Sequence, residues 1–204
     1  MVRVLVVGMG GLGCSAAPVL VQAGVPLTLC DFDRVEERNL GRQDLYTPDD
    51  VGRLKVDVAK ERLDGDIGII PAVFDATMVD GHDAVLDCTD EPGTRAAIHQ
   101  ACLDAGIPLV WAAVGGTDGQ LATVVPGAGP CLRCLWAGVG EPMACDDRTD
   151  ADVLRRTGRE QGLAAAAVLM GEGETGMLRL FESAEAEERV VRFERRSDCN
   201  CAVS

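Results

Sequence analysis

Aromatic residues and lysine are scarce in this chain of 204 residues. Phenylalanine, tryptophan and tyrosine together make up 3% of it, whereas hydrophobic residues of all kinds make up 47%. A buried core must therefore consist mainly of valine, leucine, isoleucine and alanine. This composition is typical of a parallel sheet whose two faces are covered by helices. Charged residues make up 25%, which indicates a folded chain rather than a disordered one.

The sequence also lacks a basic cluster and a long apolar run. Its net charge is −14, so its surface repels nucleic-acid backbones and anionic lipids. Acidic residues interrupt the one short basic group, around Arg195 and Arg196. No run approaches the roughly 20 apolar residues of a membrane-spanning helix, and residues 2–7 are too short a run for a signal peptide. We therefore expect a cytoplasmic protein that binds neither nucleic acid nor membranes.

Aliphatic runs alternate with helical segments along the first 126 residues. Residues 2–7 form a β-branched run typical of a buried strand, and residues 11–23 are predicted to form a helix that ends before Gly24. Further strands are predicted at 26–31, 67–73, 83–87, 107–114 and 120–125, and further helices at 49–64 and 91–105. This order predicts an α/β fold with a doubly wound, mainly parallel, Rossmann-like sheet.

The composition changes after Pro126. Residues 127–145 are rich in glycine, proline and cysteine and show no clear periodicity. A helix is predicted at 150–170, followed by two short strands at 177–181 and 189–195. We expect residues 1–126 to form a nucleotide-binding core and residues 127–204 a C-terminal extension of the same domain.

A glycine-rich turn follows the first strand. Gly8, Gly10, Gly11 and Gly13 match G-x-G-x-x-G, in which the backbone approaches a phosphate closely and the helix N-terminus offers unpaired N–H donors. Asp31 ends the second strand, where a carboxylate can accept hydrogen bonds from a ribose. The motif alone fits NAD as well as ATP, and it also fits a tight turn that binds nothing.

A polar segment after the second strand favours ATP. It contains Asp31-Phe32-Asp33-Arg34-Val35, Asn39-Leu40-Gly41-Arg42-Gln43 and Val51-Gly52-Arg53-Leu54-Lys55. Arginine offers a planar fork of donors and lysine a point charge, and fixed donors of this kind stabilise the charge that builds up during transfer at a phosphate. The alternative is that Arg42 and Lys55 are ordinary surface residues.

These three segments together resemble the nucleotide site of the ThiF/MoeB family of adenylating enzymes, which are relatives of the ubiquitin-activating enzymes. The resemblance extends from Val2 to the last cysteine. It implies that Asp31 holds the ribose of ATP, and that the triphosphate is surrounded by Asn39, Arg42, Gln43 and Lys55.

The segment Asp87-Cys88-Thr89-Asp90 adds to the resemblance. It follows a strand, at the end where α/β sheets bind ligands. The resemblance implies that Asp90 helps to hold Mg²⁺, a hard cation suited to carboxylate oxygen. The family usually has asparagine after this aspartate, whereas this chain has Glu91. Alternatively, Asp87 or Asp90 caps the helix that follows.

Two close cysteine pairs stand apart from the other five cysteines. Cys131 and Cys134 form a CxxC, and Cys199 and Cys201 a CxC near the C-terminus. Four thiolates suffice for a closed tetrahedral Zn²⁺ site, which would tie the tail to the middle of the chain. The family carries such a site as CxxC…CxxC, so Cys201 departs from its pattern. Free thiols and a redox CxxC are the alternatives.

The remaining cysteines are single. Four of them lie in apolar segments and are interpreted as small buried hydrophobic residues: Cys14, Cys30, Cys88 and Cys102. Cys145 lies where some ThiF-like enzymes use a cysteine for sulfur transfer or a covalent link to the carrier. Such a role needs a thiol of low pKa, and the neighbouring Asp146 and Asp147 would raise it.

The family resemblance implies a reaction and partners. The reaction is ATP-dependent adenylation of the C-terminal Gly-Gly carboxylate of a ubiquitin-like sulfur carrier protein, giving an acyl-adenylate and pyrophosphate ahead of thiocarboxylate formation. A homodimer is also implied. Two alternatives remain: adenylation of a small-molecule carboxylic acid, and an NAD-dependent oxidoreductase. The latter lacks an evident proton relay, because His82 and His99 are interpreted as structural.

Overall fold

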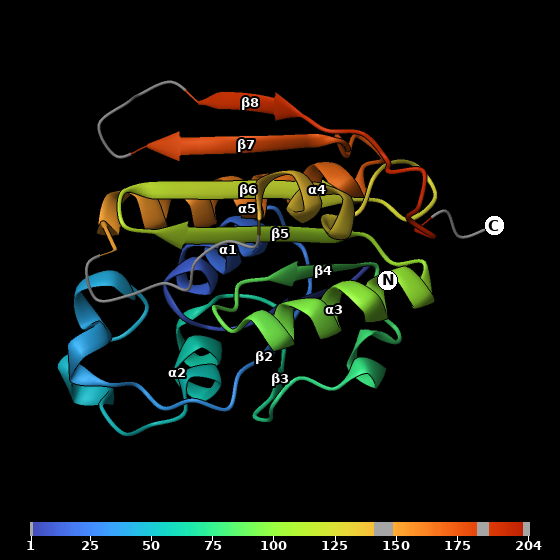
Figure 1. Cartoon of the computed structure of the whole chain (residues 1–204). Coiled ribbons are helices and arrows are strands. Elements are labelled where there is room, and N and C mark those ends of the chain that lie inside the picture. The colour runs from blue at the N-terminus through green and yellow to red at the C-terminus, as the bar shows by residue number, and fades with distance from the viewer. Residues whose placement is uncertain (1, 141–148, 183–187, 202–204) are drawn as a thin grey trace.

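A computed structural model describes residues 2–140, 149–182 and 188–201 of the chain. Its strands form one eight-stranded sheet in the order β3-β2-β1-β4-β5-β6-β7-β8 (Figure 1). The first five strands are parallel, and β6, β7 and β8 each run antiparallel to the preceding strand. The strands are β1 Val4–Val7, β2 Leu27–Cys30, β3 Ile67–Ile70, β4 Ala84–Asp87, β5 Leu109–Gly115, β6 Asp118–Val124, β7 Met177–Glu182 and β8 Arg189–Arg192. The predicted doubly wound, mainly parallel α/β fold is confirmed.

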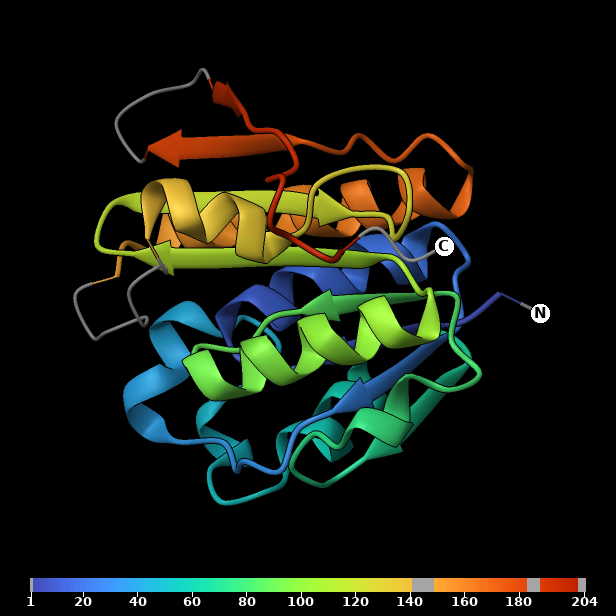
Figure 2. The ribbon, with the colours of Figure 1, turned by 45° about the vertical axis from the view of Figure 1, so that its right-hand side comes forward.

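Helices cover both faces of the sheet (Figure 2). The helices are α1 Gly11–Gln22, α2 Lys55–Arg62, α3 Pro92–Ala105, α4 Leu132–Val139 and α5 Ala151–Leu169, with shorter 3₁₀ turns η1 Glu37–Arg42, η2 Pro48–Asp50 and η3 Ala76–Val79. Helices α1, α2 and α5 pack on one face of the sheet, where their apolar residues form a core with Val4 and Val6. Helices α3 and α4 pack on the other face, where the core includes Leu5 and Val7. This alternation along β1 makes the strand apolar on both sides. No helix of the described residues combines the length and hydropathy needed to cross a bilayer.

Helix α5 packs closely on α1 through two glycines. A Cβ atom at Gly158 would lie 2.6 Å from the carbonyl oxygen of Leu12, and one at Gly162 would lie 2.8 Å from that of Ala16. Larger residues at either position would push the helices apart. This contact brings the first turns of α5 beside the glycine-rich turn, although the two are about 140 residues apart in sequence.

One local prediction is wrong, and one helix is not predicted by the sequence. The helix predicted over 49–64 is divided, because η2 ends at Asp50 and α2 begins only at Lys55 after a turn that contains Gly52, whose φ is +90°. Such a φ interrupts a right-handed helix. Helix α4 lies in the segment whose sequence shows no clear periodicity, because eight residues are too few for a helical pattern to stand out among glycines and cysteines.

Candidate functional site

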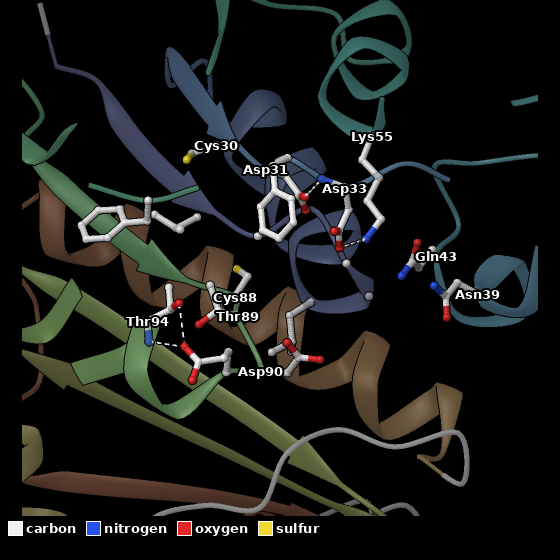
Figure 3. A pocket seen from close by; sticks show the side chains of 18 of the residues that line it. Cys30, Asp31, Asp33, Asn39, Gln43, Lys55, Cys88, Thr89, Asp90 and Thr94 are labelled. Carbon is white, nitrogen blue, oxygen red and sulfur yellow. Dashed lines mark hydrogen bonds and ion pairs between the residues drawn. The ribbon is translucent and has the colours of Figure 1, made fainter. Parts of the chain in front are cut away.

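A cavity of about 630 Å³ lies at the carboxyl ends of β1, β2 and β4. The strand order reverses between β1 and β4, where α/β sheets of this type bind their ligands. The wall of the cavity includes nine of the ten residues that the sequence predicts at the nucleotide: Gly8, Gly10, Gly11, Asp31, Asn39, Arg42, Gln43, Lys55 and Asp90. Figure 3 shows labelled side chains around this space from the end of β2, the η1 turn and the residue after it, the start of α2, and the segment from the end of β4 into α3.

The glycines of the turn have different functions. Gly8 has φ +93°, and a Cβ atom there would lie 2.8 Å from the carbonyl oxygen of Cys88. Gly13, the predicted residue that does not line the cavity, packs against the turn itself, with its Cβ position 2.1 Å from the carbonyl oxygen of Gly8. A Cβ atom at Gly10 would have Nε2 of Gln43 as its nearest neighbour, 3.8 Å away. A side chain at Gly10 would therefore occupy space at the cavity wall that is open in this chain.

The N-terminus of α1 lies at the same wall. Its N-cap is Gly10, and within the described residues no side chain caps it. The first N–H groups of a helix lack partners in the helix itself and carry partial positive charge. They suit an anionic ligand such as a phosphate.

Asp31 supports the glycine-rich turn from the next strand. Its carboxylate accepts hydrogen bonds from the backbone N–H of Met9 at 2.6 Å and from that of Asp33 at 2.7 Å. Burial raises the pKa of Asp31, and the charge of Lys55 together with the two N–H donors opposes this rise. Each oxygen of a carboxylate can accept more than one hydrogen bond, so Asp31 can hold the turn and still accept from a ligand hydroxyl.

Lys55 is a buried residue at the first position of α2. Only 5% of its surface is exposed, and its Nζ donates to Oδ2 of Asp33 at 2.9 Å (Figure 3). This burial argues against the alternative that Lys55 is a solvated surface residue. An ammonium group has three donors, so it can bind Asp33 and still donate to an anion in the cavity.

The η1 turn contributes amide and guanidinium groups. Nη2 of Arg42 donates to Oδ1 of Asn39 at 3.1 Å, which joins two of the predicted residues. Gln43 is 5% exposed, and its Oε1 has no hydrogen-bond partner among the described residues. A buried polar atom without a partner is costly, so a ligand or water in the cavity would satisfy it.

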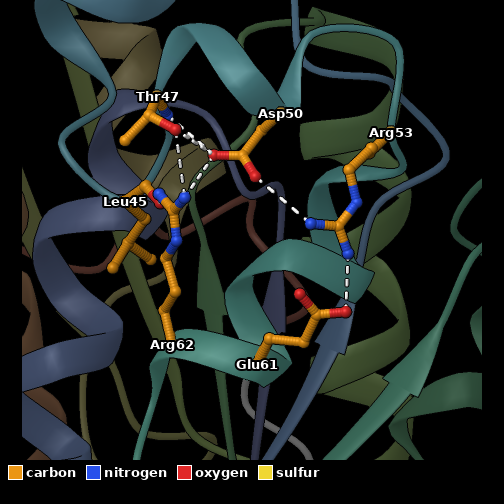
Figure 4. A network of polar contacts seen from close by, with 6 residues as sticks. All are labelled: Leu45, Thr47, Asp50, Arg53, Glu61 and Arg62. Carbon is orange, nitrogen blue, oxygen red and sulfur yellow. Dashed lines mark hydrogen bonds and ion pairs between the residues drawn. The ribbon is translucent and has the colours of Figure 1, made fainter.

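A polar network holds the loop between Gln43 and Lys55 (Figure 4). Asp50 is buried and accepts from the N–H and Oγ1 of Thr47, both at 2.8 Å, and from Nη1 of Arg53 at 3.2 Å. Arg62 of α2 also donates to Asp50 and to the carbonyl oxygen of Leu45. The network thereby fixes where α2 begins, and with it the position of Lys55.

The segment after β4 forms the opposite wall. Asp90 is exposed at the cavity, where its carboxylate is available to a divalent cation. The alternative that Asp87 or Asp90 caps α3 is wrong, because Glu91 is the cap and accepts from the N–H of Gly93 at 2.8 Å and of Thr94 at 2.5 Å. Asp87 is fully buried, and burial raises its pKa to about 6.

Two buried residues that hold the end of β4 are not evident from the sequence. Arg95 donates from Nε and Nη2 to the carbonyl oxygen of Thr89 at 3.1 and 2.7 Å. Gln161 of α5 donates to the carbonyl oxygens of Asp87 at 2.7 Å and of Val110 at 3.0 Å. Both hold the backbone at the end of β4. Only the arginine could have been found, as a charged residue one turn into an apolar helix.

The four paired cysteines lie together, away from the cavity. Their ligand atoms are all within 4.8 Å of one another. The Sγ–Sγ distances are 3.9 Å for Cys131 and Cys134, 3.6 Å for Cys131 and Cys199, and 3.8 Å for Cys134 and Cys201. A tetrahedral Zn²⁺ with Zn–S bonds of about 2.3 Å places its sulfurs about 3.8 Å apart. The cluster, Cys201 included, therefore fits Zn²⁺.

The single cysteines also have definite positions. Cys14, Cys30, Cys88 and Cys102 are buried, as predicted. Burial raises the pKa of Cys14 and of Cys102 to about 12, so these thiols stay protonated. Cys145 lies outside the described residues.

Comparison with known proteins places these features in context. A family model described as the ThiF family matches residues 1–202. Molybdopterin-synthase adenylyltransferase of Escherichia coli (strain K12) is 36% identical over 212 residues, which cover 97% of this chain and 85% of the relative. Sulfur carrier protein ThiS adenylyltransferase of the same organism is 38% identical over 214 residues, which cover 97% and 84%. Adenylyltransferase and sulfurtransferase MOCS3 of Bos taurus is 38% identical over 213 residues, which cover 96% of this chain and 47% of that protein.

A solved structure shares the fold. The crystal structure of E. coli MccB with ATP superposes with a TM-score of 0.84 at 21% sequence identity, covering 99% of this chain and 67% of that one. This likeness independently supports the sheet order and the layers of helices described above.

Proposed function

Because this chain belongs to the ThiF family, we propose that it is an ATP-dependent adenylyltransferase acting on a ubiquitin-like sulfur carrier protein. Two of the most similar relatives are named for molybdopterin synthase and for the sulfur carrier ThiS. Their names favour a protein acceptor over a small-molecule acid, and adenylation over NAD-dependent oxidation. The acceptor group is the carboxylate of the carrier's C-terminal Gly-Gly.

The observation that carries the proposal is the convergence of fixed donors on one cavity. The N-terminus of α1, Arg42 and Lys55 present positive charge to the same space, and Asn39 and Gln43 present amides. ATP carries most of its charge on three phosphates, which this arrangement complements. On this proposal, the glycine-rich turn and these four side chains bind the triphosphate, and Asp31 accepts from the ribose hydroxyls.

In the reaction, a carboxylate oxygen of the carrier attacks the α-phosphorus of ATP. The new oxygen–phosphorus bond forms as the bond between the α-phosphorus and the bridging oxygen breaks, so the products are acyl-adenylate and pyrophosphate. Arg42 and Lys55 stabilise the charge that develops on the phosphates. A bound Mg²⁺, which Asp90 would hold, supplies further positive charge there.

The C-terminal part of the chain has a structural role in this proposal. Residues 127–204 form an extension that faces the carrier, and the four paired cysteines hold a Zn²⁺ ion that ties the tail to α4. Cytoplasmic thiols are kept reduced, which suits a site made of four thiolates, and we place the protein there. The homodimer in this proposal rests on the family resemblance.

The two lysines of α2 provide the test. Lys55 lines the cavity, whereas Lys60 is exposed on the same helix. Lys55→Ala or Arg42→Ala should lower carrier adenylation about 10²–10³-fold, as removal of one donor to a developing anion does elsewhere. Lys60→Ala should leave it unchanged. Formation of the acyl-adenylate, measured by mass spectrometry of the carrier, distinguishes these outcomes, and equal rates in Lys55→Ala and Lys60→Ala would contradict the proposal.

A further inference from the structure

Arg155 of α5 contacts Gly41 in the η1 turn and Asp44 just after it. Its Nε donates to Oδ2 of Asp44 at 2.7 Å and its Nη2 to Oδ1 at 3.0 Å, a bidentate pair. Nη2 also donates to the carbonyl oxygen of Gly41 at 3.1 Å. Planar, charge-assisted pairs of this kind fix orientation as well as distance.

The two contact points enclose the proposed phosphate-binding residues. Gly41 and Asp44 immediately precede and follow Arg42-Gln43. The guanidinium of Arg155 thus holds the backbone before this dipeptide, at the Gly41 carbonyl, and the side chain of the residue after it, Asp44. Gly41 is exposed, and a Cβ atom there would meet nothing within 4 Å, so packing around Gly41 itself does little to hold the chain.

The helix that carries Arg155 packs on the glycine-rich turn through the residue before this arginine. Nη1 of Arg155 donates to Asp152 one turn earlier at 3.0 Å. The preceding residue, Leu154, packs on the glycine-rich turn: a Cβ atom at Gly11 would lie 2.4 Å from Cδ2 of Leu154 and 2.8 Å from the carbonyl oxygen of Arg42. The glycine-rich turn, the η1 turn and α5 therefore meet beside the cavity.

We propose that Arg155 is a positioning residue for adenylation, which acts by holding Arg42 and Gln43 at the triphosphate. The inference rests on the proposed function. The alternative is an ordinary surface ion pair, since the Arg155 and Asp44 side chains are 38% and 54% exposed. An exposed ion pair adds little to folding stability, so stability does not separate the two interpretations. They differ in whether removal of the Arg155–Asp44 contact slows adenylation. Loss of a positioning contact lowers the rate of the chemical step, whereas loss of a surface pair does not.

The test compares two arginines of α5. Arg155→Ala should lower kcat for carrier adenylation roughly 10- to 100-fold, as a displacement of about 1 Å in the reacting geometry does. The KM for ATP should change less than the rate, and the melting temperature should stay close to that of the wild type. Arg155→Lys keeps the charge but not the fork, and should recover only part of the rate. Arg159→Ala, exposed on the same helix, should match the wild type.

Asp44 gives a second comparison. If both residues act through one contact, the double variant Arg155→Ala/Asp44→Ala should be no slower than Arg155→Ala alone. Equal kcat values for Arg155→Ala and Arg159→Ala would overturn the proposal. So would a double variant whose loss in kcat equals the losses of Arg155→Ala and Asp44→Ala combined.

Hydrogen exchange supplies a readout that does not depend on activity. Amides of residues 41–44 should exchange faster in Arg155→Ala than in Arg159→Ala, because the contacts that hold this segment are lost. If the wild-type protein adenylates nothing, the proposed function fails, and the exchange result still decides whether Arg155 orders the turn. Unchanged exchange at 41–44 would reject the positioning role.

Discussion

Replacement of Asp50 by alanine should destabilise the protein through the network that fixes the start of α2 (Figure 4). The Asp50 side chain is 4% exposed and pairs with Arg53 and Arg62. Removal of one member of a buried ion pair costs about 3–5 kcal/mol, because the other member loses its partner. Arg62 and Arg53 are 33% and 42% exposed and can recover water, so we expect the low end, about 3 kcal/mol.

This free energy converts to a measurable shift in melting temperature. An unfolding entropy of about 2.1 cal/mol/K per residue gives about 0.43 kcal/mol/K for this chain, so a loss of about 3 kcal/mol lowers the melting temperature by about 7 °C. Asp49→Asn is the matched control, since Asp49 is exposed beside Asp50. Calorimetry of both variants at neutral pH measures the difference. Equal melting temperatures for Asp50→Ala and the wild type would refute the reasoning.

The effect should also depend on pH. Burial raises the pKa of Asp50, but hydrogen bonds from Thr47 and the charges of Arg62 and Arg53 outweigh it, and the net pKa is lowered. A carboxyl with a lowered pKa stabilises the fold above its unfolded value of about 3.9, and this contribution is lost as the pH falls through the folded value. The gap between the wild type and Asp50→Ala should therefore be full at pH 7 and shrink below about pH 4.

Two further substitutions test the metal site and the cavity. Cys134→Ser should lower the zinc content below one ion per chain and reduce thermal stability, because a structural zinc site contributes directly to folding. Cys102→Ser changes a buried thiol outside the cluster and should keep the metal. Full zinc occupancy of Cys134→Ser, measured by elemental analysis, would exclude the site. Gly10→Ala should fold normally but weaken ATP binding roughly tenfold, about 1.4 kcal/mol, because its methyl group projects toward the cavity. Gly138→Ala, at a position with open space around it, is the control, and unchanged affinity in Gly10→Ala by calorimetric titration would contradict the proposed phosphate position.

The sequence predicted most of the fold because its strands are aliphatic runs that end in recognisable turns. The predicted runs 2–7, 26–31 and 83–87 contain β1, β2 and β4, and β1 pairs in parallel with both of the others. Gly24 and Gly106 follow the ends of α1 and α3 as predicted. The match of the ThiF family model to residues 1–202 confirms the resemblance carried by the glycine-rich and polar motifs. Motifs of this kind can be recognised from sequence because residues that are close in the chain lie in the same loop of the structure.

Contacts between distant segments could not be predicted in this way. Arg155 and Asp44 are 111 residues apart, and Gln161 and Asp87 are 74 apart. Nothing in the local pattern of α5 marks Arg155 as different from Arg159, because the difference arises only when α5 packs on α1. The part played by Gly13 was likewise hidden, since its motif indicates a ligand whereas its Cβ position faces Gly8.

The most direct measurement of the central claim is ATP–pyrophosphate exchange by the wild-type protein, with and without a sulfur carrier ending in Gly-Gly. We expect exchange only when the carrier is present, and its loss when the carrier's last glycine is removed, because the reacting carboxylate is then displaced from the α-phosphorus. Exchange supported by small carboxylic acids but not by the carrier would contradict the account, as would binding of NAD in place of ATP.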